Sequence, residues 1–304
     1  MESKERTLAP RYVSLTTRKG SEVRRTLPHR DIFMIGAWCF IDHYGPTDSA
    51  DLMSIGAHPH IGLQTVSWLF SGHLEHRDSL GSVQKIKPGE LNVMTAGYGI
   101  AHSELSQIGS EPLRGVQLWI ALPESVRGMA PQFHHHADLP QSEHDGFTFH
   151  TFIGRYRGDT SPAEVFTNLV GVEISTGESS TTELPVVSEY EYGILVDEGE
   201  LTINGAQVRA GELHYLPAGS ATISVTTTGA SRFLLLGGEA FPEKIVMWWN
   251  FVASSHEEIA TARADWQAQN LSRFAYFSDA LQERIPAPEM PNLRLTARAR
   301  QRNL

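Results

Sequence analysis

The sequence predicts an all-β protein in which two similar β-units follow one another and a helix comes after the second. Three observations support this prediction. Up to about residue 245, short apolar or alternating runs are separated by clusters of Gly, Pro, Asp and Asn. One pattern of strands and glycine turns occurs twice along the chain. After the second copy, apolar residues recur at the spacing of a helix.

The expected strands are short and alternate between two faces. In residues 115–122, Val116, Leu118 and Ile120 share one face, while Gln117 and Trp119 share the other, because successive side chains of a strand point in opposite directions. Further runs of this kind are expected as strands at residues 65–70, 91–95, 192–196, 201–203 and 233–236.

The repeat consists of an apolar strand, a glycine turn and the start of the next strand. Its turn glycines are Gly72 in the first copy and Gly199 in the second. A Gly-Glu-Leu sequence follows in both copies, at Gly89 and at Gly211, and each copy then reaches a turn that ends in Ala-Gly. Two tandem copies of one β-unit imply two similar barrels or sandwiches.

The segment between the two units is rich in His, Pro, Gln and Asp and is expected to be a linker over residues 133–147. The first unit then spans residues 1–132 and the second spans residues 148–245. The three consecutive histidines His134, His135 and His136 fall in this linker, where solvated side chains are expected.

Residues 246–304 are expected to hold the C-terminal helix and a basic tail. Ser255 and Glu258 form a capping-box pattern, and Ile259, Ala262 and Trp266 follow at helical spacing. A helix with this pattern packs back on the barrels. The last stretch, 294–302, carries four arginines and few apolar residues, so it predicts a solvated end.

Composition and charge exclude several classes of protein. The 25 Lys and Arg against 35 Asp and Glu give a net charge of -10, which disfavours direct binding to nucleic acid. Cys39 is the only cysteine, so no intramolecular disulfide can form, and its apolar surroundings predict a buried, inert thiol. No run of about 18 apolar residues and no signal-peptide pattern occurs. We therefore expect a cytoplasmic protein.

Two short motifs are candidates for metal binding. His58-Pro59-His60 places two imidazoles on one face of an extended segment, and His102-Ser103-Glu104 does the same with an imidazole and a carboxylate. On neighbouring strands the four groups converge. Such a set suits one divalent metal, iron(II) first, and also accepts manganese, nickel, copper or zinc. The alternative is that these are surface histidines, since histidine pairs on surfaces are common.

The second copy of the repeat is an internal control for this prediction. Counting from the turn glycines, the positions that correspond to the four candidate ligands carry no good ligand, and a shift of a few residues offers only Glu189 and Glu191. The second unit is therefore expected to be structural and metal-free. The corresponding residues are Pro185, Val187, Ser224 and Thr226.

Ordered sequence blocks lie at residues 40–46, 58–65, 75–79, 94–104, 117–119 and 122–123. Together they resemble the pirin family of bicupins over residues 36 to 123. The resemblance is looser in the second half, at residues 244–247 and 249–266. It implies two tandem cupin barrels of the jelly-roll type, with metal ligands at His58, His60, His102 and Glu104. The chain has Gln64 where many pirins have Glu, which predicts the loss of a carboxylate near the pocket.

The resemblance implies a function close to that of the cupin quercetin 2,3-dioxygenases, which open flavonols with dioxygen. In that reading the metal binds the flavonol oxygen, and Glu104 loosens from the metal to act as the base for the hydroxyl proton. Met94, Gln117 and Trp119 can line the cavity, although core positions are equally compatible with each of them.

Two other functions stay open at this point. Some pirins act without catalysis, as metal-dependent, redox-responsive partners of transcription factors or metabolic enzymes, and a third possibility is a bicupin that binds a small molecule without turnover. Under the enzymatic reading the partners are a small aromatic substrate and dioxygen. A monomer is expected, because two barrels in one chain already cover each other's inner faces.

Overall fold

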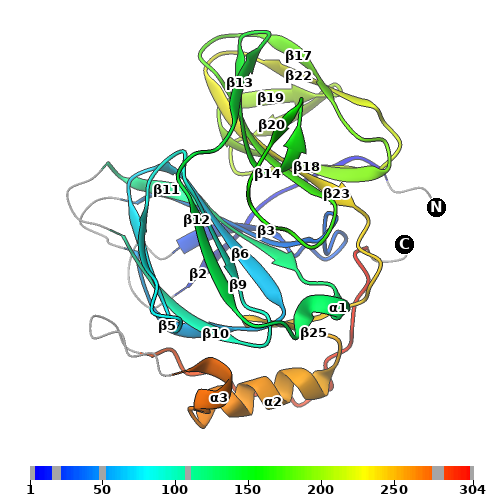
Figure 1. Cartoon of the computed structure of the whole chain (residues 1–304). Helices are drawn as coiled ribbons and strands as arrows, with labels where there is room; N and C mark the ends of the chain where they lie inside the picture. Colours follow the sequence, from blue (N-terminus) through cyan, green and yellow to red (C-terminus); the bar gives the residue numbers. More distant parts are fainter. Residues whose placement is uncertain (1–3, 16–21, 48–52, 107–110, 276–283, 302–304) are drawn as a thin grey trace.

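The computed structural model describes residues 4–15, 22–47, 53–106, 111–275 and 284–301, and it shows two β-barrels with a helical segment beside the first (Figure 1). The first barrel is mostly blue and cyan in Figure 1, with its strand β12 in green, and the second is mostly green and yellow. The predicted all-β fold with two cupin barrels and a C-terminal helix is confirmed. No helix in the described part of the chain is long and apolar enough to cross a membrane.

The first barrel consists of a large and a small antiparallel sheet. The large sheet has the order β12-β9-β6-β11-β4-β3-β2, and the small sheet has the order β5-β10-β7-β8. The strands are β2 (Arg11–Ser14), β3 (Glu22–Leu27), β4 (Trp38–Thr47), β5 (Ser54–His60), β6 (Leu63–Ser71), β7 (Leu74–Asp78), β8 (Val83–Ile86), β9 (Leu91–Thr95), β10 (Ile100–Ser106), β11 (Leu113–Ala121) and β12 (Gln132–His136).

The second barrel repeats this topology. Its large sheet has the order β1-β21-β18-β23-β16-β14-β13, with β15 paired to β14, and its small sheet has the order β17-β22-β19-β20. The strands are β1 (Arg6–Leu8), β13 (Gln141–His144), β14 (Phe147–Tyr156), β15 (Asp159–Thr160), β16 (Leu169–Thr176), β17 (Thr181–Pro185), β18 (Tyr190–Glu198), β19 (Glu200–Ile203), β20 (Ala206–Arg209), β21 (Leu213–Leu216), β22 (Thr222–Thr227) and β23 (Ser231–Glu239).

The two topologies agree strand by strand, from β4 with β16 to β11 with β23. The turn glycines that revealed the repeat have the left-handed backbone conformation that other residues rarely adopt: φ is +75° at Gly72 and +86° at Gly199. Gly89 and Gly211 behave in the same way, with φ of +85° and +88°. The repeated glycines therefore mark equivalent turns between equivalent strands.

Residues 133–147, expected as a linker, instead contribute edge strands to both barrels. Strand β12 pairs with β9 of the first barrel, and β13 pairs with β14 of the second. In the second barrel, the edge that corresponds to the position of β12 is occupied by the N-terminal strand β1, which pairs with β21. Each edge strand covers backbone N–H and C=O groups that would otherwise be unpaired. The expected boundary of the first unit, 1–132, therefore leaves out all but the first residue of β12, and it includes β1, a strand of the other barrel.

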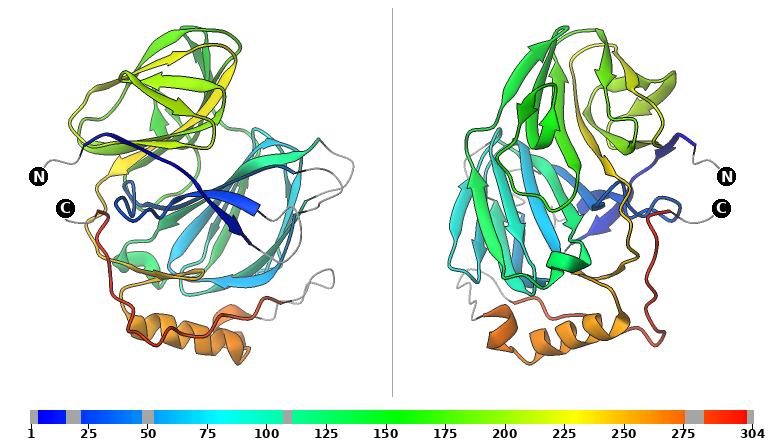
Figure 2. Two further views of the ribbon diagram at one scale, coloured as in Figure 1. Left: turned by 180° about the vertical axis from the view of Figure 1, so that it is seen from behind. Right: turned by 45° about the vertical axis from the view of Figure 1, so that its right-hand side comes forward.

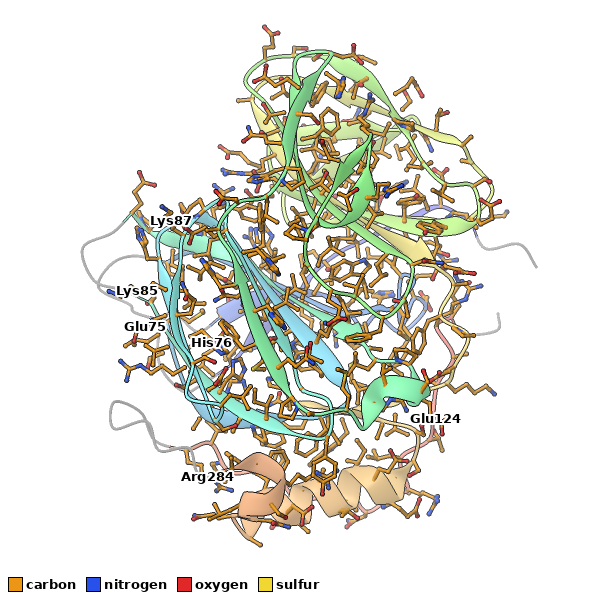
Figure 3. The ribbon with its side chains drawn as sticks, viewed as in Figure 1. Glu75, His76, Lys85, Lys87, Glu124 and Arg284 are labelled. Atoms are coloured by element: carbon orange, nitrogen blue, oxygen red, sulfur yellow. The ribbon has the colours of Figure 1, made fainter. Side chains whose placement is uncertain are left out.

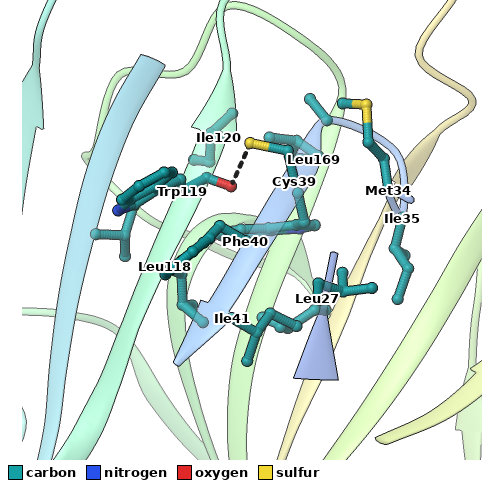
Figure 4. Close-up of a cluster of buried hydrophobic side chains, with 14 of the residues drawn as sticks. Leu27, Met34, Ile35, Cys39, Phe40, Ile41, Leu118, Trp119, Ile120 and Leu169 are labelled. Carbon is teal, nitrogen blue, oxygen red and sulfur yellow. Dashed lines mark hydrogen bonds between the residues drawn. The ribbon is translucent and has the colours of Figure 1, made fainter. Parts of the chain in front are cut away.

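A shared hydrophobic core lies between the two large sheets, with side chains from both barrels. Cys39 lies within it, 3.6 Å from the carbonyl oxygen of Trp119 (Figure 4). Burial raises the pKa of the Cys39 thiol to about 12, which agrees with the inert thiol predicted from the sequence. The face of each large sheet that does not join this core faces the interior of its own barrel.

The C-terminal segment packs on the first barrel. A helical turn, α1 (Glu124–Arg127), follows β11, and a hairpin of β24 (Val246–Trp248) and β25 (Phe251–Ala253) leads into α2 (His256–Gln267) and α3 (Leu271–Phe274). Ser255 caps α2 by accepting a hydrogen bond from the backbone N–H of Glu258. Ile259, Ala262 and Trp266 are buried in one cluster with residues of β10, as the helical spacing predicted.

The basic end of the chain is mostly exposed to solvent, but over its described part it is attached to the rest of the protein. It returns from the helices towards the second barrel, as the red segment in Figure 2 shows. Arg298 pairs with Ile245 through the backbone, and Arg300 forms an ion pair with the buried Glu191. The sequence did not indicate this attachment, because the carboxylate that binds Arg300 lies more than a hundred residues away in the sequence. Residues 302–304 lie outside the described residues.

Candidate metal centre

The two predicted histidine motifs lie side by side in the small sheet of the first barrel. His58 and His60 are on β5, and His102 and Glu104 are on the neighbouring strand β10, where His102 lies directly opposite His58. The ladder shifts register between His102 and Glu104, so that Glu104 pairs with Ile55. All four candidate ligands are buried.

The three imidazole rings converge. One ring nitrogen from each of His58, His60 and His102 lies within 4.8 Å of the others, and the Nε2 atoms of His60 and His102 are 3.0 Å apart. Within the described residues, no second group of three such side chains converges in this way. The carboxylate of Glu104 lines the same cavity without belonging to this group.

The outer nitrogens of two rings are already bound to the backbone. Nδ1 of His58 lies 2.8 Å from the carbonyl oxygen of Gly56, and Nδ1 of His60 lies 3.2 Å from that of Asn250. A carbonyl oxygen only accepts, so each Nδ1 donates its proton, and each Nε2 keeps a lone pair that points to the cluster. These are the tautomers that a metal ion requires.

Burial also keeps these rings neutral. It lowers the pKa of His58 to about 4, and it lowers the pKa values of His60 and His102 well below the usual 6.5, with further contributions from neighbouring histidines. Neutral imidazoles bind a cation without first losing a proton. Burial raises the pKa of Glu104 to about 7. The donor set therefore fits a divalent metal with nitrogen and oxygen ligands.

A cavity of about 440 Å³ opens in front of the cluster. Of the three residues predicted to line it, Gln117 and Trp119 do so, and Trp119 stacks on Phe40 with ring centroids 3.9 Å apart. The edge of Trp119 also meets the ring of His60, at 5.2 Å. Met94 is not part of this lining and packs in a separate small apolar cluster with Ala96 and Ile100.

Sequence reasoning missed the parts of the cavity wall that come from distant segments. Arg25 binds both carboxylate oxygens of the buried Asp42, at 2.7 and 2.8 Å. The hairpin after the second barrel contributes Met247, Trp249 and Asn250. The resemblance at residues 244–247 and 249–266 was the one signal that could have indicated this contribution.

Gln64 does not point to the cavity. Its amide donates to the hydroxyl of Thr95 at 2.9 Å and to the backbone carbonyl of Glu164, in the second barrel, at 3.1 Å. On β6 it shares the parity of Val66 and Trp68, which face the core between the barrels. A glutamine is suited to this position because the carbonyl oxygen of Glu164 can only accept a hydrogen bond, and an ionised glutamate has no proton to donate to it.

The second barrel carries apolar residues where the first carries its cluster. The ladders align the two barrels, because Leu74 pairs with Ser106 in the first and Leu201 pairs with Thr227 in the second. On this alignment, the second-barrel counterpart of each candidate ligand lies one residue before the position that was predicted by counting from the turn glycines, because the connections between the strands differ in length. The counterparts of His58, His60, His102 and Glu104 are, in order, Leu184, Val186, Ile223 and Val225.

The remaining sequence candidates have structural contacts. Glu191 lies between the barrels and accepts a hydrogen bond from the backbone N–H of Gly36 at 2.8 Å. The three consecutive histidines form most of strand β12, where His135 is bonded to Asn92 at 2.8 Å. They were predicted as solvated linker residues because an edge strand with one covered face has a largely polar sequence.

Together these features define a bicupin with a candidate metal centre in its first barrel. Two family models match the chain: the pirin model over residues 20–120, and the model of the pirin C-terminal cupin domain over residues 171–272. A pirin-like protein of Caulobacter vibrioides is 37% identical over 81% of this chain and 88% of its own length. The chain belongs to the pirin family.

Two further relatives carry dioxygenase names. A Pseudomonas aeruginosa protein named "putative quercetin 2,3-dioxygenase" is 43% identical over 90% of this chain and 87% of its own. The crystal structure of a quercetin 2,3-dioxygenase from Acinetobacter baumannii superposes with a TM-score of 0.92, at 38% identity, over 96% of this chain and 98% of that one.

Proposed function

We propose that this protein is a metal-dependent dioxygenase that acts on a flat aromatic compound of the flavonol type, with iron(II) as its metal. The observation that carries the proposal is the convergence of three neutral imidazoles in a cavity with aromatic walls. The dioxygenase names of the Pseudomonas and Acinetobacter relatives support the reaction class.

His58, His60 and His102 would hold the metal, with Glu104 as the fourth ligand. When bound, the metal supplies a Lewis acid and a binding position for dioxygen. In the metal-free protein, burial raises the pKa of Glu104 to about 7. A carboxylate in this apolar position is a candidate for the group that accepts and returns a proton. In this role Glu104 would accept the proton of the hydroxyl group of the bound aromatic compound.

The cavity wall is suited to a planar substrate. The stacked pair of Phe40 and Trp119 presents a flat apolar surface next to His60, and Trp249 and Met247 add apolar surface from the C-terminal hairpin. Aromatic surfaces of this kind bind rings by stacking and exclude water. Gln117, held by a hydrogen bond from Ser67 at 2.9 Å, offers a polar group beside them.

The test is oxygen uptake with quercetin by protein reconstituted with iron(II). Turnover by the wild-type protein that disappears in Glu104→Gln supports the proposal. The matched control is Glu183→Gln, which changes an exposed glutamate of the second barrel and should leave turnover unchanged. Full metal occupancy without oxygen uptake contradicts the proposal. That result would favour the alternative function, a metal-dependent regulator of another protein, and a search for its partner.

A further inference from the structure

Strand β7 brings a second pair of polar side chains against the histidine cluster, on the side of β10 away from β5. In this ladder His76 lies opposite Glu104, and Asp78 lies opposite His102. Both side chains are buried, and neither lines the cavity. Figure 3 marks His76 inside the first barrel.

Three side chains form a continuous hydrogen-bonded chain. Nε2 of His76 lies 3.0 Å from Oδ2 of Asp78, and Nδ1 of His76 lies 3.3 Å from Nδ1 of His102. The other oxygen of Asp78 accepts hydrogen bonds from the backbone N–H groups of Leu80 and Ser82, at 2.9 and 3.0 Å. The carboxylate is therefore fixed in place at the outer end of the chain.

The direction of the protons follows from the chemistry of these groups. Burial raises the pKa of Asp78, but its hydrogen bonds, first of all that from His76, bring the pKa below its usual value, so the group is an ionised acceptor. His76 must then donate from Nε2, which leaves a lone pair on Nδ1 in the neutral ring. The contact at 3.3 Å is consequently donated by Nδ1 of His102.

We infer that His76, oriented by Asp78, is a positioning residue that holds His102 in the tautomer with a free Nε2 for the metal. Nε2 of His60 also carries a lone pair, so two acceptors face each other at 3.0 Å, an arrangement that a shared cation stabilises. This inference rests on the proposed metal site and does not depend on the reaction.

Two further contacts support this role. The ring of His76 stacks on Phe133 of strand β12, with centroids 4.3 Å apart and an angle of 10° between the planes. In the second barrel, which has apolar residues at the ligand positions, the counterpart of His76 is Ile203, opposite Val225. The polar chain therefore accompanies the histidine cluster and is missing where the cluster is missing.

Three variants separate hydrogen bonding from packing. His76→Phe keeps a flat ring against Phe133 and removes both nitrogens. His76→Gln keeps one acceptor and one donor. Asp78→Asn keeps the shape of the side chain, but its amide can donate N–H to Nε2 of His76. His76 would then donate from Nδ1 to His102, which would place the proton of His102 on Nε2. The matched control is His214→Phe. His214 is a buried histidine of the second barrel, and its Nε2 lies 3.4 Å from a carboxylate oxygen of Glu5.

The first measurement is zinc(II) affinity by competition with a chelator, with thermal unfolding of each variant alongside. His76→Phe and Asp78→Asn should weaken zinc binding by about 10- to 100-fold. His76→Gln should recover most of the affinity, and His214→Phe should bind zinc like the wild type. In the zinc-loaded wild type, the NMR signal of the proton on Nδ1 of His102 should be protected from exchange, and His76→Phe should lose that protection.

The inference is overturned if His76→Phe and Asp78→Asn bind zinc as tightly as the wild type. It is also overturned if His76→Gln is as weak as His76→Phe at equal thermal stability, because packing would then explain the loss. A wild-type protein that binds neither zinc nor iron would overturn the proposed metal site, and the inference with it. Zinc binding without oxygenase activity would contradict only the proposed reaction.

Discussion

His43 of the first barrel and Asp197 of the second lie 2.8 Å apart, from Nε2 to Oδ1, and both side chains are closed to solvent. The same carboxylate accepts hydrogen bonds from Arg114 at 3.0 Å and Arg232 at 2.9 Å. These partners come from β4, β11 and β23, so one side chain joins both barrels. The position of the two barrels relative to each other depends on this contact as well as on the shared apolar core.

Replacing Asp197 should destabilise the protein strongly. Asp197→Ala leaves His43 and two arginines without their acceptor, and the expected loss is about 3 kcal/mol in the free energy of unfolding, measured with urea. Glu198→Ala is the matched control, because Glu198 binds the same arginines but is half exposed. It should lose less than about 1 kcal/mol. Equal losses in the two variants would contradict a special role of the buried carboxylate.

His43 should make stability depend on pH. Burial is the largest cause that lowers its pKa below 6.5, so the folded protein keeps the ring neutral while the unfolded chain binds a proton as pH falls below 6.5. Stability is therefore lost as pH falls from 7 to 5. The pKa of Asp197 is below its usual 3.8, so the stabilisation by Asp197 is fully present in this range and is lost only at lower pH.

The variant His43→Gln tests this expectation, because its amide can still donate to Asp197 but does not titrate. The other histidines are common to both proteins, so the difference in unfolding free energy between wild type and His43→Gln isolates His43. In metal-free protein, the unfolding free energy of the wild type relative to that of His43→Gln should be lower at pH 5 than at pH 7. A difference that is the same at both pH values would contradict the expected effect of burial.

The features that could be predicted from the sequence depend on local geometry. The turn glycines revealed the repeat because Gly72 and Gly199 adopt a backbone conformation that favours glycine, at equivalent turns. His58 and His60 could be expected on one face because two residues of a strand, two apart, point the same way. Their partner motif on β10 could be chosen because it has the same spacing.

The features that could not be predicted depend on contacts between distant segments. Nothing near His60 in the sequence indicates that Asn250 binds its outer nitrogen. The link between His76 and His102 could not be predicted either, because it requires the register of β7 and β10. For Met94 the sequence left a cavity position and a core position equally open, because residue type and strand parity do not determine how far a cavity extends; it packs in a small apolar cluster.

Removing one ring of the cluster should empty the metal site. After reconstitution, His60→Ala is expected to bind only a small fraction of the metal that the wild type binds, as measured by elemental analysis. The surface histidines His134, His135 and His136 should be replaced by alanine in both proteins, because a histidine strand can bind metal during purification. Stoichiometric metal in His60→Ala on this background would show that the ligand set is wrong.

Trp119 should control substrate binding without affecting the metal. It stacks on Phe40 and its edge meets His60, so Trp119→Leu removes the flat surface nearest the cluster while it leaves the three imidazoles in place. The KM for quercetin should rise by about fivefold, since a stacking contact contributes about 1 kcal/mol beyond the area it buries. Metal content should stay unchanged. Met94→Leu is the matched control, because Met94 lies outside the cavity lining, and its KM should equal that of the wild type. An unchanged KM in Trp119→Leu would mean that the aromatic substrate does not rest on this wall.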